Sequence, residues 1–522
     1  MASSGNFGTW NPLNIGSGGS TSLTVGNTNA VMTGADPRTA ANVGGVISDT
    51  DGYYFETVAT SAGSGALTLG IINEDRHNQL TSGQIHSRSG SFMWRGYDGG
   101  AFFVETSSNT SYGTFTDGDV LGWYVKNSKL YVKKNNSDVV GDVVNTSGGI
   151  DISGGFFFPA VSRTVGGGAQ TSSILRTDSD DWSYSPPEGF KGLTSKDMVI
   201  TEEVDPAQDA GPNTHFDVVT YTGNGSTQSI TSLGFQPDWT LIKNRSTGDW
   251  CNQNSSLGVG KSQKWNDDGG VSSDTDAVTS FNSDGFSLGA DSKVNTSSAN
   301  YVAYCWKKSA EAGLDIVTYS GGGGSQAVSH SLGVTPDCIF IMLNTGTALD
   351  SIMYLNSASM GTSYGIFPTL ANARQNTTYV SATTSSNFTV TGSADTSGRT
   401  YFAYVLKSIA GFSRFGQYYA NANTNGPFTY LGFRPRLVII KALESGQTWF
   451  FFDTARSTHN VIDLYLYGQR DLAESTAGTI DIDFLSNGFK IRSSGSDLNS
   501  SSGQAYAYLA WADVPFKYNN TF

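Results

Sequence analysis

The chain contains one module three times, and this internal repetition limits the folds that are open to it. The segments FDVVTYTGNG from Phe216 and LDIVTYSGGG from Leu314 are alike at most positions. A second set of segments recurs about one hundred residues apart: LGFQPDWTLIKN from Leu233, LGVTPDCIFIML from Leu332 and LGFRPRLVIIKA from Leu431. A unit of this length is too long for one rung of a solenoid, so the sequence predicts three tandem domains at 214–309, 313–408 and 411–522.

Short strands joined by tight turns are the predicted building blocks of each copy. Aliphatic runs such as LVIIK follow a proline that marks the start of a strand. Each copy ends in a run that alternates large and small apolar residues, YVAYCWKK from Tyr301, YFAYVLKS from Tyr401 and AYAYLAWA from Ala505. No segment has a clear helical period. The predicted fold class is therefore all-β, as tandem antiparallel β-sandwich domains with very little helix.

The region before the repeats has a different sequence but the same kind of pattern. Residues 48–197 contain apolar runs of about five to seven residues separated by turn residues, which predicts a further antiparallel β-sandwich. Residues 1–47 are rich in Gly, Ser, Thr and Asn, and we expect an irregular N-terminal arm. Residues 198–213 carry prolines and acidic residues without an apolar period, which is typical of a linker.

The charge of the chain excludes some classes of partner. Thirty-one basic residues face 45 acidic ones, a net charge of −14, which argues against binding to nucleic acid or to an anionic membrane surface. The start of the chain lacks a basic segment followed by an apolar stretch, and no run reaches the ~18 apolar residues of a membrane span. We therefore expect synthesis in a cytoplasm, no signal peptide and no membrane insertion.

The N-terminal region resembles the SPRY (B30.2-like) domain family. The resemblance covers nearly all of 48–195 and consists of short motifs in the family's order: Tyr54-Phe55-Glu56, Gly118-Asp119-Val120-Leu121-Gly122, Leu130-Tyr131-Val132, Phe158-Pro159-Ala160-Val161-Ser162 and Pro186-Pro187-Glu188-Gly189-Phe190. It implies a β-sandwich whose loops at one end bind protein ligands.

The three repeats are similar to a module common in virion proteins of tailed bacteriophages, especially marine phages. The matching features are the Tyr-Thr-Gly-Asn-Gly opening, Leu-Gly-Phe-x-Pro-Asp, an aliphatic strand that ends in Lys, and the closing Tyr-x-Ala-Tyr strand. This resemblance covers 214–522 and implies a virion location. Copy 2 departs from the pattern, because ALDSIMYLN stands where the other copies have Trp250 and Trp449.

Catalytic, metal and cofactor motifs are not evident. The five histidines are scattered without HExxH or HxH, and Cys251, Cys305 and Cys338 form no CxxC pair. A glycosidase would need two facing carboxylates about 5–9.5 Å apart, and 45 acidic residues leave that choice open. We expect no enzyme activity, no cofactor and no metal.

Aromatic residues next to charged ones are the better lead to a binding site. Trp94, Arg95 and Tyr97 lie in SFMWRGYDGG, and Arg76 and His77 lie in a loop that the SPRY-like arrangement would bring nearby. Trp250 follows turn residues and is a candidate rim aromatic. The alternative is a core position for Trp94, since Phe92 and Trp94 share one face of a strand. We expect Trp449 to be a core residue, because the apolar run Phe450-Phe451-Phe452 follows it.

Together these features predict a structural component of a bacteriophage virion, a tail fibre or adhesin-type appendage. Its partners would be other virion proteins, a host receptor (glycan or protein) and further copies of the same chain, with a trimer expected by analogy. The arm at 1–47 would attach it to the particle. Two alternatives stay open: an architectural decoration protein of the capsid or tail without receptor binding, and a polysaccharide depolymerase.

Overall fold

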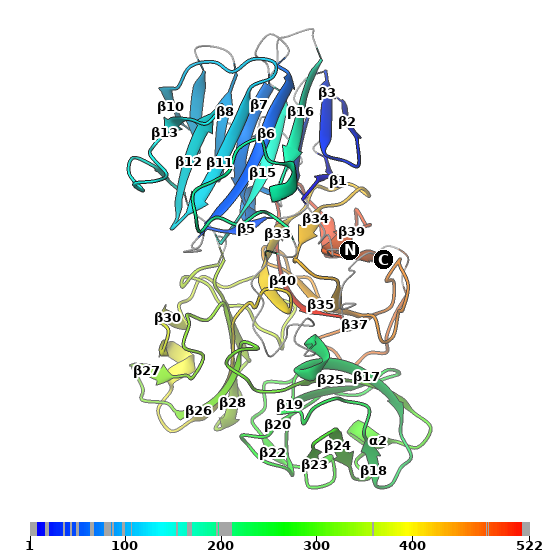
Figure 1. Cartoon of the computed structure of the whole chain (residues 1–522). Helices are drawn as coiled ribbons and strands as arrows, with labels where there is room; N and C mark the ends of the chain where they lie inside the picture. Colours follow the sequence, from blue (N-terminus) through cyan, green and yellow to red (C-terminus); the bar gives the residue numbers. More distant parts are fainter. Residues whose placement is uncertain are drawn as a thin grey trace. The chain divides into compact units, whose positions relative to one another are not determined.

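The computed structural model divides the chain into two compact units, Met1–Met198 (unit 1) and Val199–Phe522 (unit 2). It describes residues 8–15, 20–34, 37–41, 44–47, 52–62, 67–77, 85, 88–96, 100–105, 107–152, 155–163, 170–194, 197, 211–357, 360–476, 478 and 480–513. Nearly all regular structure there is antiparallel β (Figure 1), as the sequence predicts. The α-helices α1 (Glu74–His77), α2 (Ser292–Asn295) and α3 (Ser496–Asn499) have four residues each.

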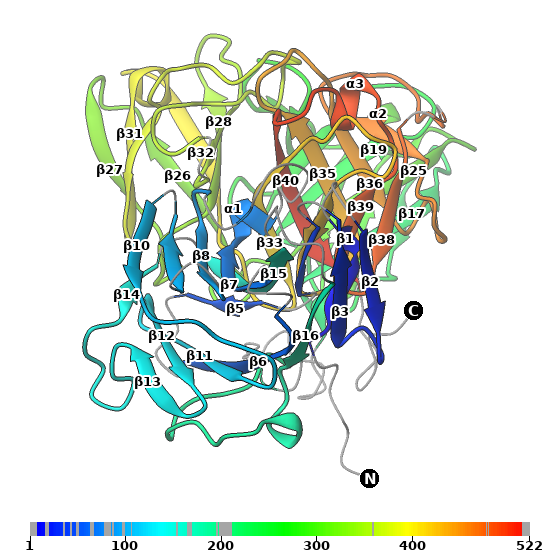
Figure 2. The same cartoon turned by 90° about the horizontal axis from the view of Figure 1, so that it is seen from above.

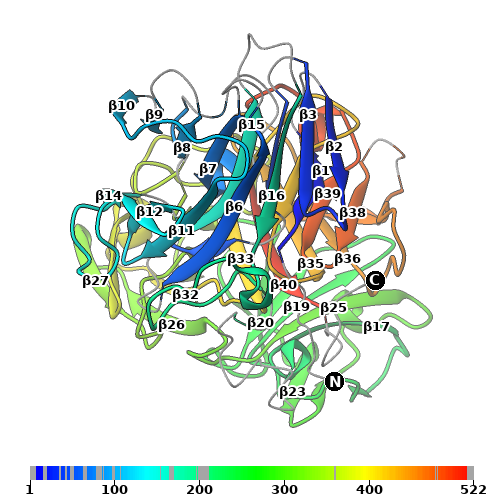
Figure 3. The same cartoon turned by 45° about the horizontal axis from the view of Figure 1, so that its top comes forward.

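Unit 1 is a sandwich of two sheets, which Figure 2 shows as separate layers. The first sheet has the order β1 (Trp10–Ile15), β4 (Arg38–Ala41), β15 (Phe156–Arg163), β7 (Leu67–Asn73), β8 (Ser91–Arg95), β9 (Ala101–Val104) and β10 (Ser107–Ser111), with β5 (Gly45–Val46) beside β15. The second, whose strands follow one another across Figure 3, has the order β13 (Ser137–Val140), β12 (Lys129–Lys134), β11 (Val120–Lys126), β6 (Tyr53–Ser61), β16 (Thr171–Arg176), β3 (Asn29–Thr33) and β2 (Ser20–Thr24), with β14 (Ile150–Asp151) beside β12.

The expectation of an irregular arm at 1–47 is wrong for the part of it that the structure describes. Strands β1, β4 and β5 extend the first sheet, and β2 and β3 extend the second. Trp10 and Met32 are fully buried in the core between the sheets. A segment of small polar residues can form strands when ladder hydrogen bonds and a few buried side chains hold it, which composition alone does not reveal.

A buried carboxylate fixes the last segment of unit 1 against the second sheet. Glu56 on β6 is fully buried and accepts hydrogen bonds from the Tyr54 hydroxyl and from the backbone N–H groups of Ser183 and Tyr184, each at 2.8 Å. Arg176 lies 3.3 Å from its second oxygen. The Tyr-Phe-Glu motif therefore has a structural role: its Glu organises the turn that leads to 184–190.

The three copies of unit 2 have one topology, and the ribbon colours separate them (Figure 1). Each has an inner sheet and a three-stranded outer sheet. In copy 1 these are β17 (Phe216–Thr222), β25 (Asn300–Trp306), β19 (Trp239–Asn244), β20 (Cys251–Asn254), β21 (Lys261–Lys264), β22 (Ser272–Ser273), and β18 (Gln228–Ile230), β24 (Gly285–Leu288), β23 (Val278–Asn282).

The same order recurs in the other two copies. Copy 2 has β26 (Leu314–Ser320), β32 (Thr400–Leu406), β28 (Cys338–Thr345), β29 (Ile352–Leu355), and β27 (Ser325–Ser329), β31 (Asn387–Thr391), β30 (Val380–Thr383). Copy 3 has β33 (Ser413–Tyr419), β40 (Ala505–Ala512), β35 (Pro435–Ala442), β36 (Trp449–Asp453), β37 (Tyr465–Tyr467), and β34 (Phe428–Tyr430), β39 (Gly488–Ile491), β38 (Ile482–Leu485).

Both faces of each inner sheet are buried, because the three copies share a hydrophobic core in addition to their own. On β25, Tyr301, Ala303 and Cys305 face the core of copy 1. The alternate residues Val302, Tyr304 and Trp306 face a core that also contains residues of copies 2 and 3. The same alternation holds in β32 and β40. The inner sheets therefore surround one shared core, and the outer sheets lie on the side away from it.

Candidate functional site

The tryptophan that we predicted as an exposed aromatic of unit 1 is a core residue. Trp94 on β8 is 0% exposed, donates its indole N–H to the Gly113 carbonyl oxygen at 3.0 Å and packs edge-on against Phe115. The shared strand face of Phe92 and Trp94 points into the sandwich. A rigid ring in this position stabilises unit 1 and cannot touch a ligand.

The remaining residues predicted for unit 1 do not converge. Arg76 and His77 lie in α1, which follows the end of β7, where Ile72 pairs with Ser91. Arg95 pairs with Thr68 at the opposite end of the same two strands, roughly 13 Å away at ~3.3 Å per residue. His77 is 0% exposed and stacks on Phe158. Tyr97 lies outside the described residues.

The charged members of this group are also enclosed. Arg76 is 8% exposed, and burial, with Arg88 and Arg38 nearby, lowers the pKa of its guanidinium to about 10. Arg95 is half-buried with its guanidinium 4.9 Å from the centre of the Phe103 ring. The predicted five-residue site on unit 1 is therefore not a single surface among the residues that the structure describes.

Trp250 is not a rim aromatic either, because it joins two copies of the repeat. It is 0% exposed, and its indole N–H donates to the Tyr467 carbonyl oxygen of copy 3 at 3.0 Å. Trp449 in copy 3 is buried as predicted, and its indole N–H donates to the Phe367 carbonyl oxygen of copy 2, also at 3.0 Å. The two tryptophans occupy equivalent positions and make equivalent bonds, each to the next copy.

The junction between copies 2 and 1 also contains a buried tryptophan, but here it comes from copy 1 and from a different position in the repeat. Ser351 stands in copy 2 where the other copies have tryptophan, one residue before β29. Copy 1 instead contributes Trp265, which packs 5.2 Å from the Phe340 ring of copy 2. Its counterpart in copy 3 is Gly468, where an added Cβ would lie 2.8 Å from the Trp449 Cβ. Each junction therefore holds one large indole.

A second set of equivalent contacts crosses the shared core. Tyr304 of copy 1 donates to Asp453 of copy 3 at 2.8 Å. Its counterpart Tyr404 of copy 2 donates to Asn252 of copy 1 at 2.8 Å, and Asn254, the counterpart of Asp453, donates to its hydroxyl at 3.2 Å. At the remaining junction both partners are apolar, Leu355 and Leu509, and both lie in the shared core. Three copies with matched contacts around one core form a closed pseudo-threefold ring.

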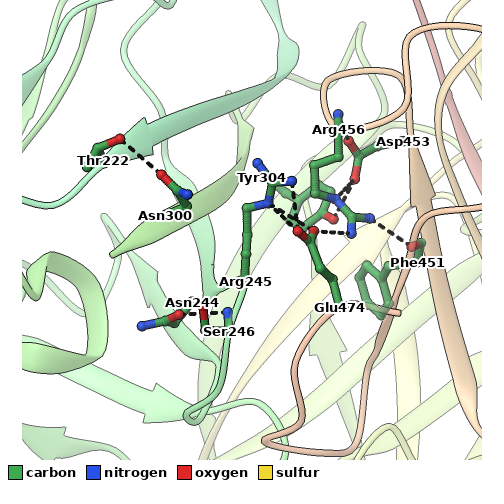
Figure 4. A network of polar contacts seen from close by, with 10 residues as sticks. All are labelled: Thr222, Asn244, Arg245, Ser246, Asn300, Tyr304, Phe451, Asp453, Arg456 and Glu474. Carbon is green, nitrogen blue, oxygen red and sulfur yellow. Dashed lines mark hydrogen bonds and ion pairs between the residues drawn. The ribbon is translucent and has the colours of Figure 1, made fainter. Parts of the chain in front are cut away.

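The junction between copies 3 and 1 carries the largest buried network of charges, drawn in Figure 4. Asp453 and Arg456 are 0% exposed at the side chain and lie 2.6 Å apart. Glu474 lies 3.4 Å from Arg456 and 2.8 Å from Arg245 of copy 1. Burial raises the pKa of Tyr304, so its hydroxyl stays protonated and donates to Asp453. This network closes the ring where no short linker joins the copies.

Two pairs of neighbouring carboxyl groups stand out among the described residues of copy 1, Asp267 with Asp268 and Asp274 with Asp291, and the second pair is the more enclosed. Asp274 accepts hydrogen bonds from Ser262 and Lys293, and a carboxyl–carboxyl hydrogen bond couples it to Asp291. Lys293 and Ser262 outweigh burial and lower the pKa of Asp274, whereas burial and the Asp274 charge raise the pKa of Asp291. Two carboxyl groups in direct contact are too close for the ~5–9.5 Å separation of a glycosidase pair. Asp291 instead caps α2.

Among the described residues, no group of three or more His, Cys, Asp and Glu is placed to hold a metal ion. The three cysteines are buried and unpaired. None of the helices within the described ranges is long and apolar enough to cross a membrane.

Comparison with known proteins places unit 2 in a recognised sequence family. Residues 211–515 match the model described as a domain of unknown function, DUF7483. No curated protein sequence matches the chain. The SPRY domain of human HERC1 is similar in structure, with 12% identity over 32% of this chain and 96% of that chain and a TM-score of 0.25. A human SPRY domain has 17% identity over 30% and 94% (TM-score 0.23), and the carbohydrate-binding module CBM66 from Bacillus subtilis 10% over 34% and 96% (TM-score 0.22).

Proposed function

The chain belongs to the DUF7483 family, and we propose that it is a structural component of a bacteriophage virion, a tail fibre or adhesin-type appendage that binds the host surface without covalent chemistry. The similarity of 214–522 to a module of phage virion proteins supports the location. Assembly of several chains, with the N-terminal unit toward the particle or a neighbouring virion protein, is part of this proposal.

The closed ring of three β-sandwiches is the observation that carries the proposal. A shared core buries one face of every inner sheet, so the ring behaves as one rigid body that displays three outer sheets and their loops. Several chains in one assembly would display this surface repeatedly, so weak contacts with a repetitive host surface would add up to useful avidity. An appendage that must stay folded outside a cell also benefits from a core of this size.

The two other functions make different demands on the molecule. A depolymerase needs accessible carboxylates at the right separation, whereas in the enclosed pair of copy 1 Asp291 caps α2. A decoration protein needs a surface that neighbouring virion proteins cover. The ring suits either a receptor-binding or a decorating role, and the display of three outer sheets favours binding.

Binding of the purified full chain to intact cells of candidate hosts tests the proposal. We expect saturable binding that unlabelled chain competes away and that an acidic control protein of similar size does not show. Surface polysaccharide incubated in parallel should keep its size distribution. A folded chain that binds no candidate host would contradict the adhesin function and favour decoration, and shortened polysaccharide would identify a depolymerase.

A further inference from the structure

One corner of the sandwich occurs in all three copies and carries different chemistry in each. It lies between the segment that pairs with β20, β29 or β36 toward the edge of the inner sheet and the short helical turn before the last strand. This segment is β21 in copy 1, an isolated bridge at Ile366 in copy 2 and β37 in copy 3. The equivalent residues are Ser262 and Lys293 in copy 1, Gly365 and Ser393 in copy 2, and Tyr465 and Asp497 in copy 3.

In copies 1 and 2 a side chain of the same copy occupies the corner. Asp274 fills it in copy 1 through its contacts with Ser262 and Lys293. In copy 2 the ring of Tyr379 covers Gly365, where an added Cβ would lie 2.5 Å from that ring. Neither corner leaves room or unpaired charge for a ligand.

The corner of copy 3 contains two tyrosines and two charged side chains. The hydroxyl groups of Tyr465 and Tyr467 lie 3.4 Å apart, and the exposed Arg470 has its guanidinium 5.7 Å from the centre of the Tyr467 ring. The half-buried Asp497 lies on α3 at the position equivalent to Lys293, near enough for its charge to act on Tyr465. Within the described part of the chain, neither the Asp497 carboxylate nor the Arg470 guanidinium has a side-chain hydrogen bond or an ion pair.

An unpaired, partly buried carboxylate is unfavourable unless another group satisfies it. Burial raises the pKa of Asp497 even though Arg470 acts in the opposite direction. The guanidinium offers several N–H donors, the carboxylate accepts from O–H groups, and the half-buried face of Tyr467 offers a flat apolar surface. Two opposite charges in the same corner give no net attraction for an ion, but they suit adjacent hydroxyl groups on a ring.

We propose that this corner of copy 3, formed by Tyr465, Tyr467, Arg470 and Asp497, binds a neutral sugar of a surface glycan. The sugar ring packs on Tyr467, one hydroxyl donates to Asp497 and neighbouring oxygens accept from Arg470. The inference rests on the proposed host-surface function and names the ligand class and the copy that binds it.

Affinity electrophoresis of the full chain through native gels that contain dextran, laminarin, a galactan or a mannan tests the site. At least one of these neutral polysaccharides should retard the wild-type chain. Arg470→Gln and Asp497→Asn should each weaken that retardation about tenfold. The control Ser393→Ala, at the equivalent position of copy 2, should leave it unchanged. Circular dichroism and the unfolding midpoint of each variant show that it is folded.

Two results would overturn the glycan site. One is a wild-type chain that none of the four polysaccharides retards, and the other is equal retardation of the wild type, Arg470→Gln and Asp497→Asn. Host-cell binding separates this outcome from failure of the proposed function. If the two variants bind cells as tightly as the wild type, the corner is not the site and the adhesin function stands; if the wild type binds no cells, that function fails.

Discussion

Tyr304 of copy 1 donates a hydrogen bond to Asp453 of copy 3, and Asp453 also pairs with Arg456 at 2.6 Å, all three side chains being buried. These contacts join the first and last copies of the repeat. At the junction of copies 2 and 1 the equivalent residues are Tyr404 with Asn252 and Asn254. At the junction of copies 3 and 2 they are Leu509 and Leu355. The two residues that meet at each junction have therefore changed together, so that they still form a hydrogen bond or an apolar contact.

Asp453→Asn should destabilise unit 2 strongly. The substitution removes the nearer carboxylate from the buried Arg456 guanidinium and leaves only Glu474 at 3.4 Å, and breaking a buried pair costs about 3–5 kcal/mol. Tyr304→Phe removes one hydrogen bond and should cost about 1–3 kcal/mol. Urea unfolding followed by tryptophan fluorescence measures both.

A surface ion pair provides the comparison for that experiment. Lys264 and Asp249 lie 2.7 Å apart with side-chain exposures of 47% and 29%. Lys264→Gln should change stability by less than about 1 kcal/mol. Equal effects of Lys264→Gln and Asp453→Asn would show that the buried network does not hold the ring closed.

Exchange of the indole across the junction of copies 2 and 1 tests the ring geometry. Trp265→Gly should cost about 3–5 kcal/mol, because it removes a buried ring, and Ser351→Trp alone should cost about 1–3 kcal/mol by overpacking. The double variant places the indole where Trp250 and Trp449 have it. It should therefore be more stable than the sum of the single effects predicts, by at least about 1 kcal/mol. Simple additivity would contradict the equivalence of the three junctions.

Lys441 should make stability depend on pH. Its ammonium group is buried at the junction of copies 3 and 2 and donates to the carbonyl oxygens of Ala371, Ala442 and Gln447, while burial lowers its pKa to about 7. The unfolded chain has the ordinary pKa near 10.5 and so binds more protons between those values. This group therefore raises the free energy of unfolding as pH increases from 7 toward 10, by up to about 1.4 kcal/mol per pH unit.

Lys441→Met is the matched variant, because copy 2 has Met342 at the equivalent position. Denaturant unfolding at pH 7, 8 and 9 should give a steeper rise with pH for the wild type than for the variant. Parallel curves would mean that the three carbonyl oxygens keep the ammonium protonated throughout this range.

Trp94→Ala should act on stability and leave the binding surface of a folded chain intact. The residue is a core side chain of unit 1, and its truncation should cost about 3–5 kcal/mol. Thermal unfolding measures that loss. Host-cell binding at a temperature where the variant is folded should equal that of the wild type, whereas lost binding by a folded variant would restore Trp94 as a contact residue.

The sequence predicted the strands and the three copies because aliphatic runs, turn residues and repeated segments are local signals. It placed Trp449 correctly but not Trp94 and Trp250, since alternation on a strand shows which residues share a face and not which face meets solvent. The run YVAYCW is apolar at every position, and this was an available signal of burial on both faces. Strand β2 escaped notice because small polar residues dominate it, and β3 because its apolar run, Ala30-Val31-Met32, is short.

Residues that act across copies were the hardest to predict. The absence of a tryptophan from copy 2 was visible, but its replacement by Trp265 of copy 1 depends on how the copies pack. Within copy 3, Arg470 and Asp497 also lie far apart in sequence, and only the fold brings them close enough for Arg470 to act on the Asp497 carboxyl. No spacing rule connects such pairs, whereas comparison of equivalent positions in the folded copies does.

Immunogold labelling of phage particles purified from lysates that contain this chain tests the central claim most directly. An antibody against unit 2 should label a fixed surface structure of intact particles, and the labelled particles should lose attachment to host cells. Purified particles that lack the chain altogether would contradict the proposal that it is a virion component.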